Sequence, residues 1–596
     1  MNHWVRSAAT NCIGLACCLS LFAQTATAQK RAAIPTAKSE ASQSGEWWKN
    51  AVIYEIYPRS FQDSNGDGIG DLNGITARLD YLKELGVDAI WITPCFPSPQ
   101  VDFGYDISDY ERIDPQYGTM ADFDHLVAEA KKRHIRILLD MVMNHTSDQH
   151  KWFTAARSSR KSPYRDWFVW RDGKNQTSTD KGTAPNNWQS AFGGSSWQWD
   201  ETTRQFYYHK YYVQQPDLNW NNPKVHEAFK NVIKFWLKRG VGGFRFDAID
   251  ALFEDPQFRN EEVVKDEKGA PRINPFGEQE LGHAMTGNQP GIHTVLAEIR
   301  AYTDTFPHRD FPGDRVLVGE TFARDAGELA KLYGTPDHPE LQLPMNMQLG
   351  GVQKLDAAEF RTRIKAAEQY MHNDMPLWVF DNHDRPRLDM RYGDGIHDTE
   401  IQRAIATILF LTRGTALMYY GDEIGMKTTP PTRREDVRDP QGITGWPREK
   451  GRDGERTPMQ WNAKPKTGFT EGNPWLPVPA SASAINVESE ELDSASLLNW
   501  YKQLIALKKN HAAFFGSEDL SLDEQNHQAL TWMRIAENGA RVVISVNLTA
   551  TPQTVKLEGA GFSGSIKTLL ASQGTTAQTL SNIQLAPFGV LVAQLP

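Results

Sequence analysis

Short apolar runs alternate with amphipathic segments through the middle of the chain. Residues 51–57, 88–93 and 135–140 are nearly continuous apolar runs, and the segments 78–85 and 123–133 carry helical periodicity. This alternation is typical of a parallel sheet whose faces are covered by helices. Further strands are predicted at residues 241–250, 316–321, 341–346, 377–382 and 415–420. Eight strands separated by helices predict an α/β fold with a closed (β/α)8 barrel.

The alternation is interrupted in two places and ends before the C-terminus. Residues 145–215 are rich in Trp, Asn, Ser, Gly and Lys and are longer than an ordinary connection, so we predict an inserted small domain after the third strand. The barrel then consists of residues 46–144 and 216–516, with a long Pro/Gly/Arg-rich loop region at 422–480. Short alternating strands over residues 517–596 predict an antiparallel β-sandwich.

The N-terminus has the pattern of a secretory signal. Arg6 precedes an apolar run at residues 13–22, and Ala26-Thr-Ala28 supplies the small residues of a cleavage site. We therefore predict a signal peptide at residues 1–28 and export to the periplasm or the medium. The apolar run is too short to span a membrane. Residues 29–45 are rich in Ala, Ser, Lys and Gln without apolar periodicity, which predicts a disordered lead-in.

Composition narrows the class of protein. Among 596 residues, 40% are hydrophobic and 23% are charged, as in an ordinary soluble globular protein. The net charge of -10 argues against nucleic acid as the main partner, because such chains are basic. After removal of the signal only Cys95 remains, so we expect no internal disulfide. The oligomeric state is left open.

Four predicted strand ends carry polar side chains. In chain order they bear Asp140, Arg245 with Asp247, Glu320, and His383 with Asp384. Because the carboxyl ends of barrel strands meet at one face, we expect these groups to converge. Two carboxylates that flank a bond are what glycoside cleavage requires. Each acid alone is more often part of a buried ion pair, but three acids without compensating cations would be costly to bury for structure alone.

These motifs, in order across residues 47–510, resemble those of a known family. They are Asp140-Met-Val-Met-Asn-His145, Gln215-Pro-Asp-Leu-Asn219, Gly243-Phe-Arg-Phe-Asp247, Gly319-Glu-Thr321 and Phe380-Asp-Asn-His-Asp384. The chain resembles the α-amylase superfamily of retaining glycoside hydrolases, and within it the α-glucosidase and oligo-1,6-glucosidase branch. The resemblance implies a (β/α)8 barrel, a small oligosaccharide substrate and a closing β-sandwich.

The resemblance also implies residue roles. Asp247 would be the nucleophile, Glu320 the acid and then the base, and Asp384 the group that holds the sugar and stabilises the transition state. His145 and His383 would hydrogen-bond the same glucosyl ring. Arg245 lies two residues before Asp247, so both side chains face the same side of a strand, and its charge should keep Asp247 ionised. Neighbouring acids and burial should raise the pKa of Glu320.

Further residues would shape the substrate pocket. In the resembling enzymes an acid equivalent to Asp102 pairs with an Arg in a Gly-Arg-Asp-Gly segment, here Arg452, and both hold the terminal 4-hydroxyl. Such a pair would close the pocket behind one glucose and make the enzyme exo-acting; the alternative is a surface ion pair between loops. Tyr105 would offer a stacking face. Phe192 either lines the entrance or is an ordinary aromatic residue of the inserted domain.

The residue after the nucleophile bears on linkage preference. In this branch it tends to be Val in α-1,6-acting enzymes and Thr or a smaller residue in α-1,4-acting ones. Here it is Ala248. The resemblance therefore favours maltose-like α-1,4 substrates, with sucrose or α-1,6 substrates as the alternatives.

A polar loop after the first strand predicts a metal site. Asp63, Asn65, Asp67 and Asp71 place oxygens at alternate positions, which matches the first half of an EF-hand. Gly74 stands at the twelfth position and no long helix precedes the loop, so it is not an EF-hand. It resembles the structural Ca²⁺ loop of α-glucosidases, with the Ile69 carbonyl as a further ligand. Mg²⁺ is the alternative ion, and a metal-free polar turn is the alternative structure.

Other functions remain open at this point. A transglucosidase or sucrose isomerase would share every catalytic residue and differ in how well water competes for the intermediate. A non-catalytic relative, such as the heavy subunit of amino-acid transporters, would carry a membrane helix and lack the carboxylates. A carbohydrate sensor with a slow site would show no turnover on a chromogenic α-glucoside.

Overall fold

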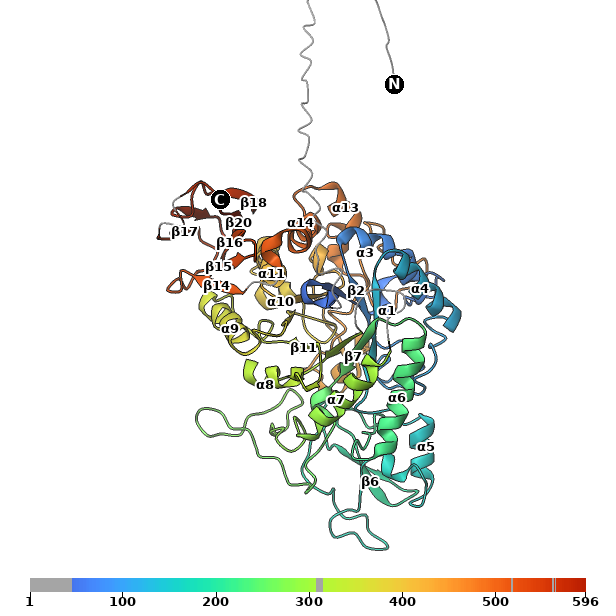
Figure 1. Ribbon diagram of the computed structural model, residues 1–596. Helices are drawn as coiled ribbons and strands as arrows, with labels where there is room; N and C mark the ends of the chain where they lie inside the picture. The colour runs from blue at the N-terminus through green and yellow to red at the C-terminus, as the bar shows by residue number, and fades with distance from the viewer. Residues whose placement is uncertain (1–45, 307–314, 516–517, 560–561, 563) are drawn as a thin grey trace, which may run out of the picture. The chain divides into compact units, whose positions relative to one another are not determined.

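A closed barrel of eight parallel strands forms the centre of the protein (Figure 1). The computed structural model describes residues 46–596 except 307–314, 516–517, 560–561 and 563, so the predicted signal peptide and lead-in lie outside the described residues. Around the barrel the strand order is β1-β13-β12-β11-β8-β7-β3-β2, which confirms the predicted fold class. The strands are β1 (Val52–Ile56), β2 (Ala89–Ile92), β3 (Arg136–Val142), β7 (Gly243–Asp247), β8 (Val316–Gly319), β11 (Leu343–Asn346), β12 (Leu377–Val379) and β13 (Thr415–Tyr419).

Strand β7 shows how the sequence sets the geometry of the rim. All five of its residues are buried. A Cβ on Gly243 would lie 2.0 Å from the carbonyl oxygen of Val316, so only glycine lets β7 approach β8 this closely. The registers pair Arg245 with Asp140 and Phe246 with Gly319. The ends of three adjacent strands therefore reach the rim at the same level.

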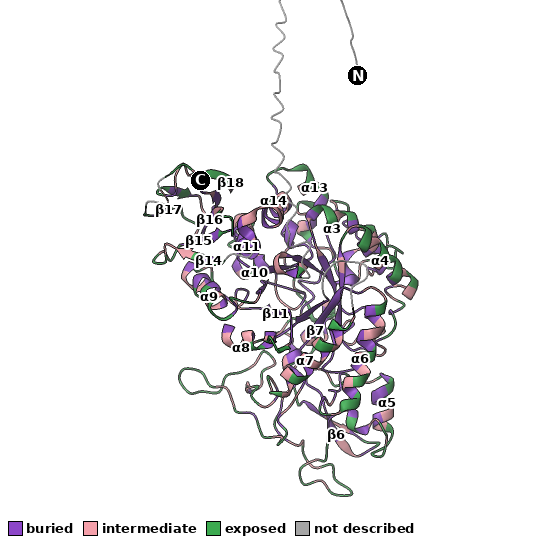
Figure 2. Cartoon of the chain, in the orientation of Figure 1, coloured by how far each residue is buried: buried purple, intermediate pink, exposed green. Residues whose placement is uncertain are grey.

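Amphipathic helices cover the barrel. In α6 (Pro223–Lys238), Asn222 caps the first turn by accepting from the backbone N–H of Lys224, and one apolar face is buried. Figure 2 shows the same division, with buried strands inside and helices whose outer faces are exposed. The other helices of the barrel are α1 (Pro58–Phe61), α2 (Leu72–Ala77), α3 (Leu79–Leu85), α4 (Met120–Lys132), α7 (Gly291–Asp304), α8 (Ala326–Ala330), α9 (Ala357–Tyr370), α10 (Leu388–Tyr392), α11 (Asp398–Leu411), α13 (Val487–Leu492) and α14 (Leu497–Asn510).

Two long excursions leave the barrel. The first follows β3 and holds α5 (Lys151–Ser158) and a three-stranded sheet of β4 (Trp170–Arg171), β6 (Gln205–Tyr208) and β5 (Trp197–Asp200). The second follows β7; its residues 253–289, here called the arm, form strand-like bridges that pair Val263 with Leu281 and Ile273 with Gln279. The indole N–H of Trp188 in the first excursion donates to the Arg259 carbonyl of the arm (2.8 Å). The two excursions therefore touch.

The region at residues 422–480, predicted as a long loop, contains a short helix, α12 (Pro440–Gly445). Asp439 caps this helix by accepting from the backbone N–H of Gln441.

The C-terminal part consists of antiparallel strands packed on the barrel helices. The indole of Trp532 donates to the Leu411 carbonyl at the end of α11 (3.4 Å), and Arg361 of α9 donates to the Glu524 carbonyl (3.0 Å). One sheet has five strands in the order β14-β15-β16-β20-β18 and a second pairs β17 with β19. These strands are β14 (Asp519–Leu522), β15 (Ala529–Ile535), β16 (Arg541–Asn547), β17 (Gln553–Val555), β18 (Lys567–Ala571), β19 (Ile583–Leu585) and β20 (Val590–Gln594).

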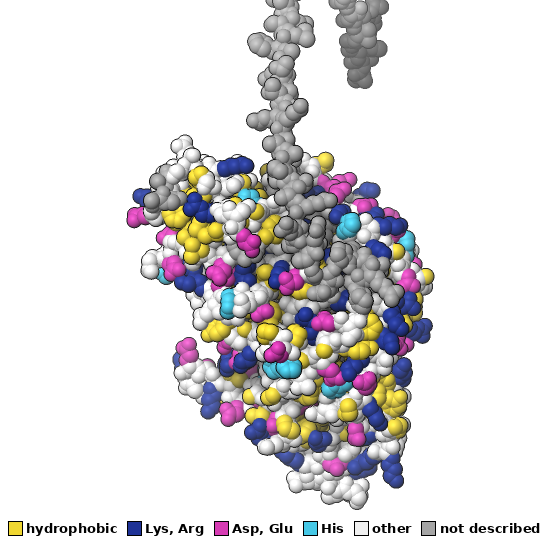
Figure 3. All heavy atoms as spheres, viewed as in Figure 1, with side chains coloured by type: hydrophobic (Ala, Val, Ile, Leu, Met, Phe, Trp, Pro, Cys, Tyr) yellow, Lys and Arg dark blue, Asp and Glu magenta, His cyan; other side chains and the backbone are white. Residues whose placement is uncertain are grey.

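The face of the molecule in Figure 3 carries basic and acidic side chains interspersed, without a continuous basic stripe. None of the described helices is both long enough and apolar enough to cross a membrane.

Candidate active site

A cavity of about 210 Å³ opens at the carboxyl end of the barrel strands. Eight of the ten residues predicted to be catalytic or substrate-binding line it, and Arg245 and His383 lie directly behind that lining. The lining residues are Asp102, Tyr105, His145, Phe192, Tyr211, Asp247, Glu320, Phe322, Asp384, Gln441 and Arg452.

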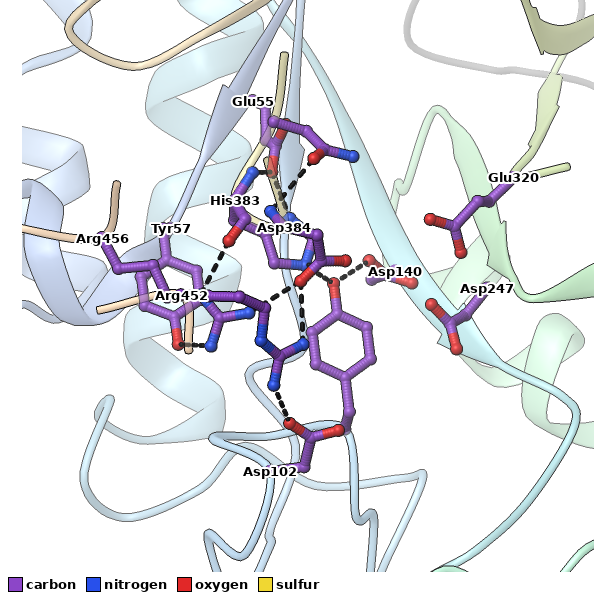
Figure 4. Close-up of polar contacts among 12 residues, drawn as sticks. Glu55, Tyr57, Asp102, Asp140, Asp247, Glu320, His383, Asp384, Arg452 and Arg456 are labelled. Carbon is purple, nitrogen blue, oxygen red and sulfur yellow. Dashed lines mark hydrogen bonds and ion pairs between the residues drawn. The ribbon is translucent and has the colours of Figure 1, made fainter. Parts of the chain in front are cut away.

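One buried guanidinium connects three acids at the rim. Arg245 Nη1 lies 2.6 Å from Asp247 Oδ1 and 3.0 Å from both carboxylate oxygens of Asp140, while Nη2 lies 2.9 Å from Glu320 Oε1. Figure 4 shows the carboxyl groups of Asp247 and Glu320 next to each other in this space. The positive charge of this guanidinium therefore offsets part of the free-energy cost of burying the three acids together.

The electrostatics separate the roles of the two central carboxyls. Burial raises the pKa of Asp247 to about 7, against the opposing charge of Arg245. Burial likewise raises the pKa of Glu320, to about 8, against the charge of Arg245 and with like charge from Asp247 and Asp384. Asp247 therefore ionises before Glu320, and Glu320 keeps its proton at neutral pH. Arg245 favours the ionised nucleophile, as the sequence predicted, but does not cancel the cost of burial.

Asp384 has the opposite environment. Its Oδ1 accepts from Arg452 Nη1 (2.9 Å) and from Arg456 Nη2 (2.7 Å). Burial alone would raise the pKa of Asp384, but His383 and the two guanidiniums outweigh burial and hold it well below its usual range. Asp384 is thus a permanent carboxylate at the edge of the cavity.

Arg452 closes one end of the cavity. Its Nη2 donates to Asp102 (2.7 Å) and its Nε donates to Asp439 (2.8 Å). The resemblance predicted a partnership of Asp102 with Arg452, and the structure places the two in contact across the loops that carry them (Figure 4). The same guanidinium lies 5.4 Å from the ring centre of Phe192.

Both histidines of the site have protein partners at both ring nitrogens. His383 lies between the Glu55 carboxylate (2.6 Å) and the Tyr105 hydroxyl (2.7 Å), so both nitrogens have protein partners. Tyr105 stacks on His383 with ring centres 5.3 Å apart, which leaves its other face toward the cavity. His145 lines the cavity, with Nδ1 at the Asn144 amide oxygen (2.8 Å) and Nε2 near the Tyr105 carbonyl (3.1 Å) and the Gln215 amide nitrogen (3.0 Å).

Sequence reasoning missed several residues of the site. Tyr211, Phe322 and Gln441 line the cavity, and Asp439 and Glu55 support it from behind. Phe322 stands two positions after Glu320, so strand alternation beyond the motif could have indicated it. Gln441 belongs to a helix in the region predicted as a loop, and no local pattern marks it.

The volume of a cavity alone does not identify the candidate active site. A larger cavity of about 520 Å³ lies near Trp170 and Glu254, against the sheet of the first excursion. It is lined by three arginines and several amides, not by the acids of the barrel rim.

In the predicted metal loop, the acidic side chains accept hydrogen bonds from N–H and hydroxyl groups. Asp63 accepts from the N–H groups of Asn65 (2.9 Å) and Gly68 (2.8 Å), and Asp67 accepts from the N–H of Ile69 (2.8 Å). Asp71 accepts from the N–H of Gly74 (2.8 Å) and so caps α2. In the part of the chain that the structure describes, no group of three or more acid, His or Cys side chains could hold a metal ion. Two of the predicted ligands, the Asn65 side chain and the Ile69 carbonyl, are not of these types, and oxygen donors of this kind suit Ca²⁺.

Comparisons with known proteins agree with this geometry. Residues 55–516 match the family model for the α-amylase catalytic domain. A probable α-glucosidase from Rhizobium meliloti is 40% identical over 531 residues, covering 87% of this chain and 93% of that protein. An oligo-1,6-glucosidase from Bacillus cereus is 36% identical over 583 residues, covering 92% and 99%.

Solved structures show the same similarity. The α-glucosyl transfer enzyme XgtA superposes with a TM-score of 0.84 at 37% identity, over 92% of this chain and 99% of that one. The trehalulose synthase MutB from Pseudomonas mesoacidophila superposes with a TM-score of 0.81 at 33% identity, over 92% and 99%.

Proposed function

Because the chain belongs to the α-amylase family of glycoside hydrolases, we propose that it is an exo-acting, retaining α-glucosidase that releases glucose from short α-1,4-linked oligosaccharides. Asp247 is the nucleophile, Glu320 the general acid and base, and Asp384 the group that stabilises the transition state.

The first step forms a covalent intermediate. A carboxylate oxygen of Asp247 attacks the anomeric carbon, the glycosidic C–O bond breaks, and Glu320 gives its proton to the departing oxygen. The pKa order supports this division, since Asp247 ionises while Glu320 is still protonated. Arg245 holds both carboxyls in place from behind.

The second step releases glucose. Ionised Glu320 takes a proton from water, the water oxygen bonds to the anomeric carbon, and the bond from that carbon to Asp247 breaks. Two displacements leave the anomeric configuration unchanged. Throughout, the permanent negative charge of Asp384 favours the oxocarbenium-like transition state and accepts hydrogen bonds from the sugar hydroxyls.

One observation carries the proposal: a single guanidinium contacts both Asp247 and Glu320 at the edge of the cavity that Asp384 lines. The test is a panel of maltose, isomaltose, sucrose, trehalose and maltotriose with product identification. Release of α-glucose from maltose is expected; no turnover on any of these sugars would refute the proposal.

Two features support a pocket for one terminal glucose and an α-1,4 preference. Arg452, Asp102 and Asp384 form a continuous ion-pair chain at one end of the cavity, which suits capture of a chain end. Ala248 is small and buried directly after the nucleophile. If isomaltose is cleaved faster than maltose, the preference is α-1,6 instead, as in the oligo-1,6-glucosidase relatives named above.

A second candidate function is glucosyl transfer. The likeness to a glucosyl transfer enzyme and to a trehalulose synthase favours it, because both structures share this fold. Product analysis at high maltose or sucrose distinguishes the two: free glucose marks hydrolysis, and new disaccharides or trisaccharides mark transfer.

We also propose that the loop at residues 63–71 binds a structural Ca²⁺ through Asp63, Asn65, Asp67, Asp71 and the Ile69 carbonyl. Oxygen donors within nine residues support this assignment. None of residues 63–71 is among those that line the active-site cavity, so the ion would stabilise and not react. The N-terminal pattern supports export with cleavage after residue 28, which N-terminal sequencing of the mature protein tests.

A further inference from the structure

An aromatic side chain of the arm lies immediately outside the substrate pocket. Phe276 is half-buried at the centre of a turn, residues 274–278. The Asn274 amide oxygen accepts from the N–H groups of Phe276 (3.0 Å) and Glu278 (2.9 Å). The Gly277 N–H donates to the Asn274 carbonyl (3.0 Å). These bonds hold the turn in one conformation and fix where the ring projects.

The Phe276 ring fills the space beside two glycines from distant parts of the chain. A Cβ on Gly193 would lie 2.8 Å from Phe276 Cγ, and one on Gly445 would lie 3.3 Å from Phe276 Cδ1. Gly193 also has a φ of +87°, a conformation that other residues rarely adopt. A side chain at Gly193 would displace the ring, and one at Gly445 would press on it.

Polar contacts tie the same turn to the same two segments. The Gly194 N–H donates to the Glu278 carboxylate (3.1 Å). On the other side the Arg448 guanidinium lies against Gly277, where a Cβ would be only 2.2 Å from Nη1. The turn therefore touches residues 193–194 of the first excursion and residues 445–448 after α12.

Each of these two segments adjoins a residue that lines the pocket. Phe192, directly before Gly193, lines the pocket and stacks on Tyr212 with ring centres 4.3 Å apart. Gln441 also lines the pocket and lies one helical turn before Gly445 in α12, so the residue that Phe276 adjoins and the residue that lines the pocket belong to the same short helix. The cap of α12, Asp439, also holds Arg452. Phe276 thus adjoins both pocket-lining segments and is not itself among the residues that line the pocket.

We propose that Phe276 is a positioning residue that holds the Phe192 wall and the Gln441 wall together at the mouth of the pocket. The inference rests on the proposed function and extends it. The Phe192 wall belongs to the first excursion and the Gln441 wall to the region of residues 422–480, and such connecting segments move more easily than barrel strands. The acids behind them are fixed by Arg245 in the barrel. Removal of the ring should therefore weaken substrate binding and leave the chemical step nearly unchanged.

The test is Phe276→Ala with Ile273→Ala as its matched control, because Ile273 belongs to the same arm and is 57% exposed. With maltose, Phe276→Ala should raise KM about tenfold and change kcat by less than about twofold. Ile273→Ala should change neither constant. Phe276→Leu, which keeps most of the apolar volume, should restore KM to within about threefold of the parent.

Two outcomes overturn the inference. One is a parental KM in a folded Phe276→Ala protein. The other is a fall in kcat and in melting temperature at constant KM, which would mark a general structural role.

Affinity for 1-deoxynojirimycin, an iminosugar the size of one glucose, separates the two proposals because it needs no turnover. If the parent cleaves no α-glucoside but Phe276→Ala still binds the iminosugar about tenfold more weakly by calorimetry, the proposed function fails and the positioning role stands. If the parent cleaves maltose and the variant binds the iminosugar like the parent, with the same KM for maltose, the positioning role fails alone.

Discussion

The barrel rim and the loop at residues 63–71 both gather acidic side chains, and they offset the charge in different ways. At the rim, Asp140, Asp247 and Glu320 come from three strands and share the guanidinium of Arg245. In the loop, the acids are neighbours in sequence and are satisfied by local N–H groups. Local N–H donors stabilise ionised acids, whereas the rim combines burial with one cation and raises the pKa values of its acids.

The largest effect on activity is expected from replacing the nucleophile at the barrel rim. Asp247→Asn should lower kcat/KM by about 10⁴-fold or more, because the amide cannot form the covalent intermediate. The matched change in the loop, Asp67→Asn, should leave kcat/KM within about twofold, because Asp67 is not among the residues that line the cavity. Hydrolysis of p-nitrophenyl α-glucoside measures both, and thermal melting checks that both variants are folded. Near-parental activity in Asp247→Asn would refute the assignment of the nucleophile.

Removal of the shared guanidinium should lower the free energy of unfolding more than removal of an exposed ion pair does. Arg245→Met leaves three buried acids without their guanidinium and should lower the free energy of unfolding by about 3–5 kcal/mol at pH 7. Arg433→Met, which removes an exposed ion pair to Asp436, should lower it far less, because water screens that pair. Urea unfolding measures both changes. If Arg245→Met costs no more than Arg433→Met, the guanidinium is not what makes the rim stable.

The pH dependence of activity should follow the titration of the rim acids Asp247 and Glu320 and not that of the acids in the loop. Below about 7 Asp247 takes up its proton and cannot attack, and above about 8 Glu320 loses the proton that it must donate. A plot of kcat/KM against pH should therefore be bell-shaped and fall about tenfold per unit on each side. A profile that stays flat from pH 5 to 9 would contradict these pKa assignments.

In the loop at residues 63–71, pH should affect stability and not activity, and only in the acid range. Hydrogen bonds from Thr470 and backbone N–H groups outweigh burial and lower the pKa of Asp63, so its folded pKa lies below its unfolded value. Its contribution to stability is present above about pH 3.9 and is lost only as the pH falls through the folded pKa.

Metal removal should have the smallest effect and act on the loop alone. If Ca²⁺ binds there, EDTA should lower the melting temperature by about 5 °C, and added Ca²⁺ should restore it. Activity at 25 °C should change little, because the rim needs no metal for the proposed steps. Asp67→Asn should lose the response to EDTA. A melting temperature that EDTA leaves unchanged counts against the metal.

Much of the fold and the core of the site could be predicted because they rest on local pattern. Each barrel strand is a short apolar run, and closing the barrel brings the carboxyl ends of all strands to one face. Asp247 and Glu320 stand at such ends, so their meeting follows from the strand assignments. The short helix α12 in the region of residues 422–480 was not predicted, because Gly and Pro dominate its surroundings.

Amino-acid order by itself determined the strand periodicity, the glycine at position 243 that lets β7 approach β8, and which acids stand at strand ends. Tertiary structure alone decided which cation each acid meets and that burial raises the pKa values of Asp247 and Glu320. It also decided that Gln441 lines the cavity, and that Phe276 lies beside Gly193, 83 positions earlier, and Gly445, 169 positions later. The physical reason is that desolvation and Coulomb interactions depend on distance and burial in space, and a linear pattern records neither.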